Sequence, residues 1–133
     1  MTEREFWAQR VRPLLPSDSW RERVENGLGA GTPDVHYCWR GRSGWIELKY
    51  RKVRPRFNDS LLFFDRGLRP AQIAWWVPYL RCGGRGLIVA GVAAEAWAWE
   101  ASEELVRKFN LSTWDQLRAC GRPLTAEQLE RWL

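Results

Sequence analysis

Two stretches in the first half of the chain alternate between apolar and polar residues, which is the pattern of half-buried β-strands. They span residues 33–39 and 45–50, and the segment between them, R-G-R-S-G, has turn chemistry. The sequence therefore predicts a β-hairpin. The side chains expected on its core-facing side are Val35, Tyr37, Trp39, Ile46, Leu48 and Tyr50.

Helical patterns and a second pair of strands surround this hairpin. Thr2 and Glu5 form a capping-box pattern before a first apolar stripe, which Pro13 and Pro16 end. The other predicted elements are a short helix capped by Ser17 or Asp18 and reaching about Glu25, a helix over 69–82, a buried strand over 85–92 that is parallel to an earlier one, a shorter edge strand over 96–100, and helices over 103–109, 114–120 and 125–133. Residues 57–68 are expected to form either a mobile flap or an edge strand.

These elements predict one α/β domain that spans residues 1–133. In chain order they follow the series α-α-β-β-α-β-β-α. We expect a mixed sheet of about four strands flanked by helices.

The opposite face of the predicted hairpin carries charge. If the apolar side faces the core, then Asp34, Glu47 and Lys49 share the open side. Two neighbouring carboxylates repel each other. Their placement on one face is explained if a divalent cation lies between them. Mg²⁺ and Mn²⁺ prefer such oxygen ligands, and Lys49 would then hold an attacking water or a phosphate oxygen. His36 shares this face and is either a neighbour of that site or an ordinary polar residue of the strand.

The charge balance favours a polyanionic partner. The chain has 21 Lys and Arg against 16 Asp and Glu, a net charge of +5. Nearly all the basic residues are arginines, which suit bidentate phosphate contacts. Four basic residues form a predicted loop beside the charged face, and we expect them to follow a nucleic-acid backbone unless the loop is a solvated connector: Arg51, Lys52, Arg54 and Arg56.

Several other classes of protein do not fit the sequence. The three cysteines show no zinc-binding spacing, the single histidine argues against Ser-His-Asp hydrolases, and no glycine-rich phosphate loop is followed by lysine. The charged N-terminus does not resemble a signal peptide, and the apolar run over 87–94 is too short to span a membrane. We therefore expect a cytoplasmic protein. Most of the ten tryptophans should be core, and some could form an interface or stack on bases.

At this point the sequence resembles the PD-(D/E)xK nuclease superfamily. The resemblance rests on Pro33-Asp34, followed after twelve residues by Glu47-Leu48-Lys49, and covers roughly residues 20–100. Its context is similar to small phage and VRR-NUC-type members and to Holliday-junction resolvases. The resemblance implies a restriction-endonuclease-like fold and Mg²⁺ or Mn²⁺ held by Asp34, Glu47 and the Leu48 carbonyl, with Lys49 orienting the nucleophilic water.

The resemblance also implies further site residues. A glutamate on an N-terminal helix often joins the metal site in this superfamily, and Glu25 matches in place, with Glu22 as the competitor. The segment R-P-A-Q resembles the next motif, in which Gln72 faces the metal site and hydrogen-bonds the water or places Lys49. Arg69 in the same segment would contact a phosphate.

Together these features predict a metal-dependent endodeoxyribonuclease, with resolvase-like selectivity for branched DNA as its finer form. Because one small domain carries one active site, cutting two strands requires two copies, so we expect a homodimer. A phage origin, with action in the bacterial host cytoplasm, is suggested by the resemblance alone. The alternatives are a nuclease-fold DNA-binding or scaffold module without turnover, and a protein-interaction domain that uses a tryptophan-rich surface.

Overall fold

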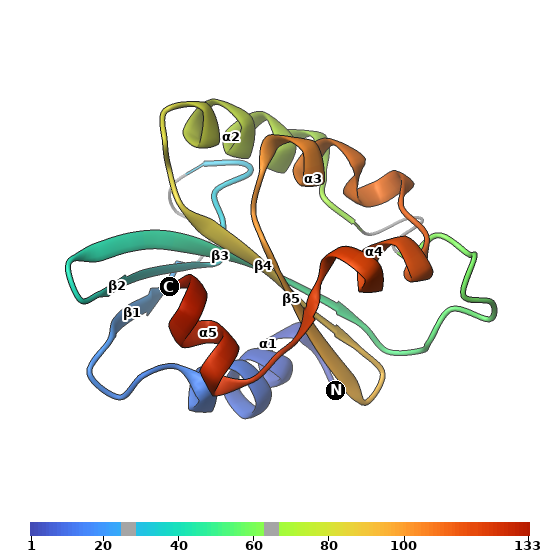
Figure 1. The fold of residues 1–133 in the computed structure, drawn as a ribbon, viewed down its shortest axis with the longest axis horizontal. Coiled ribbons are helices and arrows are strands. Elements are labelled where there is room, and N and C mark those ends of the chain that lie inside the picture. The colour runs from blue at the N-terminus through green and yellow to red at the C-terminus, as the bar shows by residue number, and fades with distance from the viewer. Residues whose placement is uncertain (25–28, 63–66) are drawn as a thin grey trace.

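The fold is α/β, with a mixed β-sheet covered by helices on both faces (Figure 1). The computed structural model describes residues 1–24, 29–62 and 67–133, and these form one six-stranded sheet in the order β1-β2-β3-β4-β5-β6. Its strands are β1 Trp20–Arg23, β2 Val35–Trp39, β3 Arg42–Arg51, β4 Gly86–Val92, β5 Glu95–Glu100 and β6 Arg122–Pro123. Strands β3 and β4 are parallel, and the other neighbours are antiparallel.

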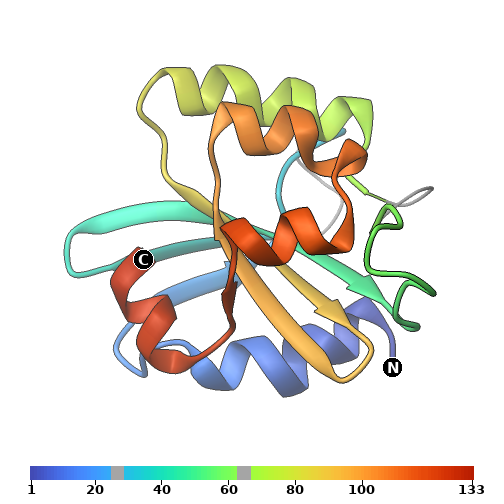
Figure 2. The same ribbon diagram turned by 45° about the vertical axis from the view of Figure 1, so that its right-hand side comes forward.

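The helices divide between the two faces of the sheet, as Figure 2 shows. Helix α1 (Glu3–Phe6), its π-helical and 3₁₀ continuations (Trp7–Val11 and Arg12–Leu14), and α5 (Ala126–Trp132) lie on one face. Helices α2 (Pro70–Arg81), α3 (Glu103–Lys108, extended by the 3₁₀ turn Phe109–Leu111) and α4 (Trp114–Cys120) lie on the other. The expected layers, a mixed sheet with flanking helices, are confirmed.

Strand β4 is central to both cores. Leu87 and Val89 face the layer of α1 and α5, while Ile88 and Ala90 face the layer of α2, α3 and α4. All its residues are buried. This explains the continuous apolar run and confirms the predicted parallel strand, because a parallel strand with helices on both faces has no solvent side.

The β2–β3 hairpin forms as predicted, with a tighter turn. Arg40 and Gly41 both have positive φ (50° and 75°), as a two-residue type I′ turn requires. The resulting register pairs Trp39 with Arg42 and Val35 with Ile46. The apolar side packs in the core of α1 and α5, and the Glu47 side faces α2.

The predicted second helix is wrong, because this segment forms β1. Its backbone pairs with β2 from Trp20 opposite Cys38 to Arg23 opposite Val35. Asp18, one of the two residues expected to cap a helix, bonds elsewhere, since its Oδ1 accepts from Trp39 Nε1 at 2.9 Å. A distant strand partner outweighs the local capping signal.

The sheet has six strands in the described chain, so the expectation of about four was too low. Besides β1, the sequence reading missed β6, whose two residues pair with Trp97 and Ala98. A two-residue strand carries no detectable periodicity. The last three predicted helices form, and the side chains of Thr113 and Thr125 cap α4 and α5.

Helix α2 begins with Pro70 in its first turn and continues past Pro78 to Arg81, close to the predicted end. In the segment 57–68, the part that the structure describes forms a single isolated bridge, Leu61 with Thr113, rather than a regular edge strand. No helix within the described ranges has the length and apolar character needed to cross a bilayer.

Candidate active site

A buried polar cluster joins β3 to the first turn of α2. Gln72 Nε2 donates to Glu47 Oε1 at 2.6 Å, and Lys49 Nζ donates to Gln72 Oε1 at 3.0 Å. The ammonium also lies 3.4 Å from Glu47 Oε1. Glu47 is completely buried and Lys49 is 8% exposed. One amide therefore holds a carboxylate and an ammonium in fixed positions.

The start of α2 fixes the Gln72 side chain. Gln72 is the third residue of the helix, and its Oε1 also accepts the Arg69 backbone N–H at 2.8 Å, which satisfies a free donor at the helix start. Pro70 occupies the first helical position, where the missing N–H has no cost. The sequence R-P-A-Q thus builds both the helix start and one wall of the site.

The loop before β2 packs directly against this helix start. Gly31 has φ +90°, and a Cβ there would lie 2.1 Å from the Ala71 carbonyl oxygen. Only glycine satisfies both the positive φ and the close approach. This contact sets the path of the chain into Asp34, three residues later.

Asp34 lies next to the Glu47 strand, immediately before β2. The backbone pairing of β2 with β3 ends at Val35 opposite Ile46. Past this pair, Asp34 Oδ2 accepts a hydrogen bond from the Leu48 N–H at 2.8 Å. In a strand, the N–H and C=O of one residue point to the same edge. The Leu48 carbonyl therefore faces the edge at which the Asp34 carboxylate is held.

Electrostatics within the cluster disfavour ionised carboxylates. Burial, reinforced by the charge of Asp34, raises the pKa of Glu47 from 4.5 to about 8, although Lys49 opposes the change. Burial also raises the pKa of Asp34, while the Leu48 hydrogen bond and Lys49 act to lower it. Glu47 Oε2 is buried and has no hydrogen-bond partner among the described residues. An unpartnered buried carboxylate oxygen is a position where a cation would be stabilising.

A third carboxylate, missed in the sequence, lies within electrostatic range. Glu3 opens α1, and its pKa is raised by burial and by the charge of Asp34, with Lys49 lowering it. The Thr2-Glu5 capping box locates this helix, so Glu3 was available as a first-turn acid. Nothing local indicated which strand the helix would cover.

The other predicted acids lie elsewhere or outside the described chain. Glu25 falls outside the described residues, so its metal role stays a prediction. Glu22 lies on β1, exposed and opposite His36. Within 1–24, 29–62 and 67–133, no three His, Cys, Asp or Glu side chains gather as a metal site. Ligands beyond Asp34 and Glu47 would therefore come from the backbone, water, a substrate phosphate or Glu25.

The basic residues expected to contact nucleic acid differ in their surroundings. The Arg51 guanidinium donates to the carbonyls of Val53 at 2.7 Å and of Leu62, so it holds the following loop together. Arg69 is exposed, and its charge lowers the pKa of Asp34, which places it beside the site.

The remaining basic residues of this loop are exposed. Arg54 Nε lies 3.6 Å from Glu95 Oε2, and the Arg56 guanidinium lies 5.3 Å from the centre of the Phe57 ring. Lys52 is exposed as well. Their contact with nucleic acid stays a prediction.

His36 lies within a row of aromatic rings. It stacks on Trp45, with ring centres 4.5 Å apart and planes 13° apart, and meets Trp20 edge-on at 5.3 Å. His36 therefore packs against rings on both sides. This matches the second alternative, an ordinary polar residue of the strand.

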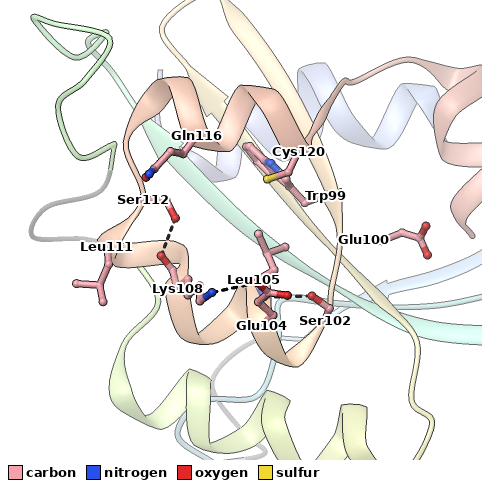
Figure 3. Close-up of a pocket in the computed structure, with 10 residues that line it drawn as sticks. All are labelled: Trp99, Glu100, Ser102, Glu104, Leu105, Lys108, Leu111, Ser112, Gln116 and Cys120. Carbon is pink, nitrogen blue, oxygen red and sulfur yellow. Dashed lines mark hydrogen bonds and ion pairs between the residues drawn. The ribbon is translucent and has the colours of Figure 1, made fainter.

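A pocket of about 680 Å³ lies between β5, α3 and α4 (Figure 3). Trp99, Leu105 and Leu111 line it, together with the Glu104–Lys108 ion pair at 3.0 Å. None of the residues of the buried polar cluster lines this pocket. The hollow and the charged cluster are separate features.

Comparison with known proteins finds a likeness among solved structures. No protein-family model matches the chain, and no curated protein matches it. Among solved structures, it is similar to the Holliday junction resolvase Hjc of the archaeal hyperthermophile Archaeoglobus fulgidus, at 18% sequence identity. The similarity covers 74% of this chain and 73% of that one, with a TM-score of 0.46. It is a likeness of fold, and the functional argument rests on the residues of this chain.

Proposed function

We propose that this protein is a Mg²⁺- or Mn²⁺-dependent nuclease that hydrolyses DNA phosphodiester bonds. The observation that carries the proposal is the buried Glu47 carboxylate, which has one oxygen held by Gln72 and the other without a partner among the described residues. A second carboxylate, Asp34, acts on its pKa from the neighbouring strand end. Lys49 lies beside both.

The donor set fits a hard divalent cation. Asp34, Glu47 and the Leu48 carbonyl would hold it, and all three supply the oxygen ligands that Mg²⁺ and Mn²⁺ prefer. When bound, the ion would polarise the phosphate and lower the pKa of a water. It would also offset the burial and the Asp34 charge that raise the pKa of Glu47 in the metal-free protein. Sites with few protein ligands are typical of Mg²⁺, which keeps waters and substrate phosphates.

Lys49 would orient the attacking water and stabilise charge that builds on the phosphate. Its ammonium is restrained by Gln72 Oε1 and Glu47 Oε1, so it needs little reorganisation during the reaction. Gln72 acts as a positioning residue, because both of its polar atoms are already bonded. Gln72 would place Lys49 and Glu47 rather than the water.

Glu3 would support the metal from α1 through a water. Burial and the charge of Asp34 raise the pKa of its carboxyl group, so a cation near Asp34 would stabilise the charges of both. This is the position on an N-terminal helix for which the sequence suggested Glu25. Glu25 remains a second candidate for the same role.

The finer features of the activity are part of the proposal. Branched DNA as substrate and endonucleolytic cutting are what the resemblance to the PD-(D/E)xK superfamily implies, and a homodimer is expected because cutting two strands requires two copies of a single site. Lys52, Arg54, Arg56 and Arg69 would contact phosphates, because they are exposed and basic. Arg51 would act mainly by shaping the loop that carries them.

The test is cleavage of labelled four-way junction, duplex and single-stranded DNA with Mg²⁺, Mn²⁺ or chelator. We expect metal-dependent cuts that are lost in Lys49→Met and kept in Lys108→Met, the matched change on an exposed lysine of α3. The preferred substrate decides between a resolvase and a general nuclease. Binding without cleavage under every condition would favour a nuclease-fold binding module without turnover.

A further inference from the structure

A row of aromatic rings crosses the face of the sheet that carries Glu47. The row runs from Trp20 on β1 through His36 on β2 to Trp45 on β3. On α2, the Trp75 ring meets Trp45 edge-on, with ring centres 5.5 Å apart. Trp75 also packs against Tyr79 in a tilted contact, with ring centres 4.8 Å apart. At its outer end Trp20 is 50% exposed. The rings come from four elements, three adjacent strands and α2.

The row begins beside the buried polar cluster. Trp45 lies two residues before Glu47 on the same face of β3, which places the two Cα atoms roughly 7 Å apart. Trp75 lies three residues after Gln72, on the same side of α2. The rings therefore extend from the cluster toward the outer edge of β1.

At the β1 end of this row, the nearby charges do not favour phosphate. On β1 and β2, the residues that share its face are Trp20, Glu22, His36 and Cys38. Glu22 is exposed and its carboxylate would repel a phosphate. What the row offers is ring faces and edges, while the chain as a whole carries a charge of +5.

We propose that this row stacks on unpaired bases of the DNA strand that is cut, with Trp20 as the outermost platform. The inference rests on the proposed nuclease function and names its substrate class: DNA with unpaired nucleotides next to the cleaved bond. Bases inside a duplex are already stacked on each other, whereas every unpaired base has a free π-face. A nucleotide whose phosphate lies at Glu47 would have neighbouring bases within reach of the row.

The test compares a single-stranded 12-nucleotide DNA with an abasic strand of equal length and charge, both in chelator so that no cleavage occurs. We expect the parent protein to bind the normal strand roughly 5- to 100-fold more tightly, as stacking on one base contributes. Trp20→Ala should lose most of this preference and keep its affinity for the abasic strand. Trp20→Phe should retain part of it, because a ring remains.

The control is Leu111→Ala, which removes an exposed apolar side chain, 73% exposed, from the pocket between α3 and α4. It should leave the preference unchanged. A second readout is ¹⁹F NMR of protein labelled with 5-fluorotryptophan, in which the Trp20 signal is the one that Trp20→Phe removes. That signal should shift with the normal strand and not with the abasic strand.

Three results would overturn the inference. In the first, the parent protein binds both strands equally. In the second, Trp20→Ala loses affinity for both strands to the same extent. In the third, Trp20→Ala changes the sedimentation mass without changing the base preference, which would make the row a contact between copies of the protein. Because binding is measured without metal, base preference in a protein that cuts nothing would reject the nuclease proposal alone. Cleavage without base preference would reject this inference alone.

Discussion

Gln72 Nε2 lies 2.6 Å from Glu47 Oε1, and the same side chain accepts hydrogen bonds from Lys49 and from the Arg69 backbone. A single amide therefore links the start of α2 to Glu47 and Lys49 of β3. Removing it would leave a buried carboxylate and a buried ammonium without their shared partner. The following predictions concern this link and the groups around it.

Gln72→Ala should lower kcat about 10- to 100-fold with little change in DNA affinity, because it removes a positioning group rather than a metal ligand. The matched control is Gln116→Ala. Gln116 is also the third residue of a helix, and its Oε1 accepts the Thr113 N–H at 2.9 Å, so the control loses the same capping contact away from the site. Equal losses of activity in both variants would show that capping alone is responsible.

Asp34→Asn should reduce cleavage by about 10²- to 10³-fold or more, because the amide is a weaker metal ligand and its NH₂ group offers donors where the ion needs an acceptor. The Leu48 N–H can still donate to the side-chain oxygen, so the fold should persist. The measurements are single-turnover cleavage and circular dichroism. Asp115→Asn, on α4, is the control, and full activity of Asp34→Asn would contradict the assignment.

Glu47 should make the metal-free protein less stable as the pH rises. Its pKa is about 8 in the folded protein against 4.5 ordinarily, so the folded state retains a proton that the unfolded chain has lost. The contribution of this proton to the free energy of unfolding is full below about pH 4.5 and is lost as the pH rises toward about 8.

Glu47→Gln removes this dependence. Relative to the parent protein, we expect the variant to gain on the order of 3 kcal/mol between about pH 5 and about pH 8, in urea unfolding with chelator. Mg²⁺ should stabilise the parent protein more at pH 8 than at pH 5, because binding requires the ionised form. A stability difference that does not vary with pH would contradict the assignment of the raised pKa to Glu47.

Glu3→Gln should move the acid limb of the pH–rate profile to lower pH. The charge of Glu3 contributes to the raised pKa of Glu47, so neutralising it lets the carboxylate ionise more easily. If Glu3 also supports the metal, the Mg²⁺ concentration needed for half-maximal rate should rise. Glu5→Gln, an exposed residue of the same helix, is the control and should change neither quantity.

Gly31→Ala should destabilise the fold more than Gly29→Ala. Both glycines have positive φ, +90° and +107°, so each substitution carries the backbone cost of about 1 to 2 kcal/mol. A Cβ at Gly29 meets nothing within 4 Å, whereas at Gly31 it meets the Ala71 carbonyl at 2.1 Å. We expect about 1 to 3 kcal/mol more for Gly31, in urea unfolding, because the helix start must shift. Equal losses in the free energy of unfolding would show that the Ala71 carbonyl moves aside without a measurable penalty.

Much of this arrangement could be predicted from short-range pattern. The period of two over 33–39 and 45–50 was enough to place Glu47 and Lys49 on one face, because strand side chains alternate whatever else the fold does. The R-P-A-Q segment identified the start of α2 and put Gln72 in its first turn. These features depend on neighbours within a few residues.

Other features depended on partners far away in the chain. Residues 20–23 follow the helix-capping signal of Ser17 or Asp18, yet they become a strand because the free edge of β2 offers hydrogen bonds that a short isolated helix cannot match. The approach of Glu3 to Asp34 depends on how α1 packs across the sheet, and no sequence spacing encodes that distance. The aromatic row is likewise assembled from four elements.

The sequence by itself thus determined the hairpin, its two faces and the chemistry placed on one of them, since side-chain periodicity and turn residues act locally. The tertiary structure decided which carboxylate approaches the site from the N-terminal helix and how Gln72 hydrogen-bonds to both Glu47 and Lys49. It also decided which rings form the aromatic row across β1, β2, β3 and α2. These outcomes follow from long-range packing, in which burial and hydrogen bonding between distant segments outweigh local preference.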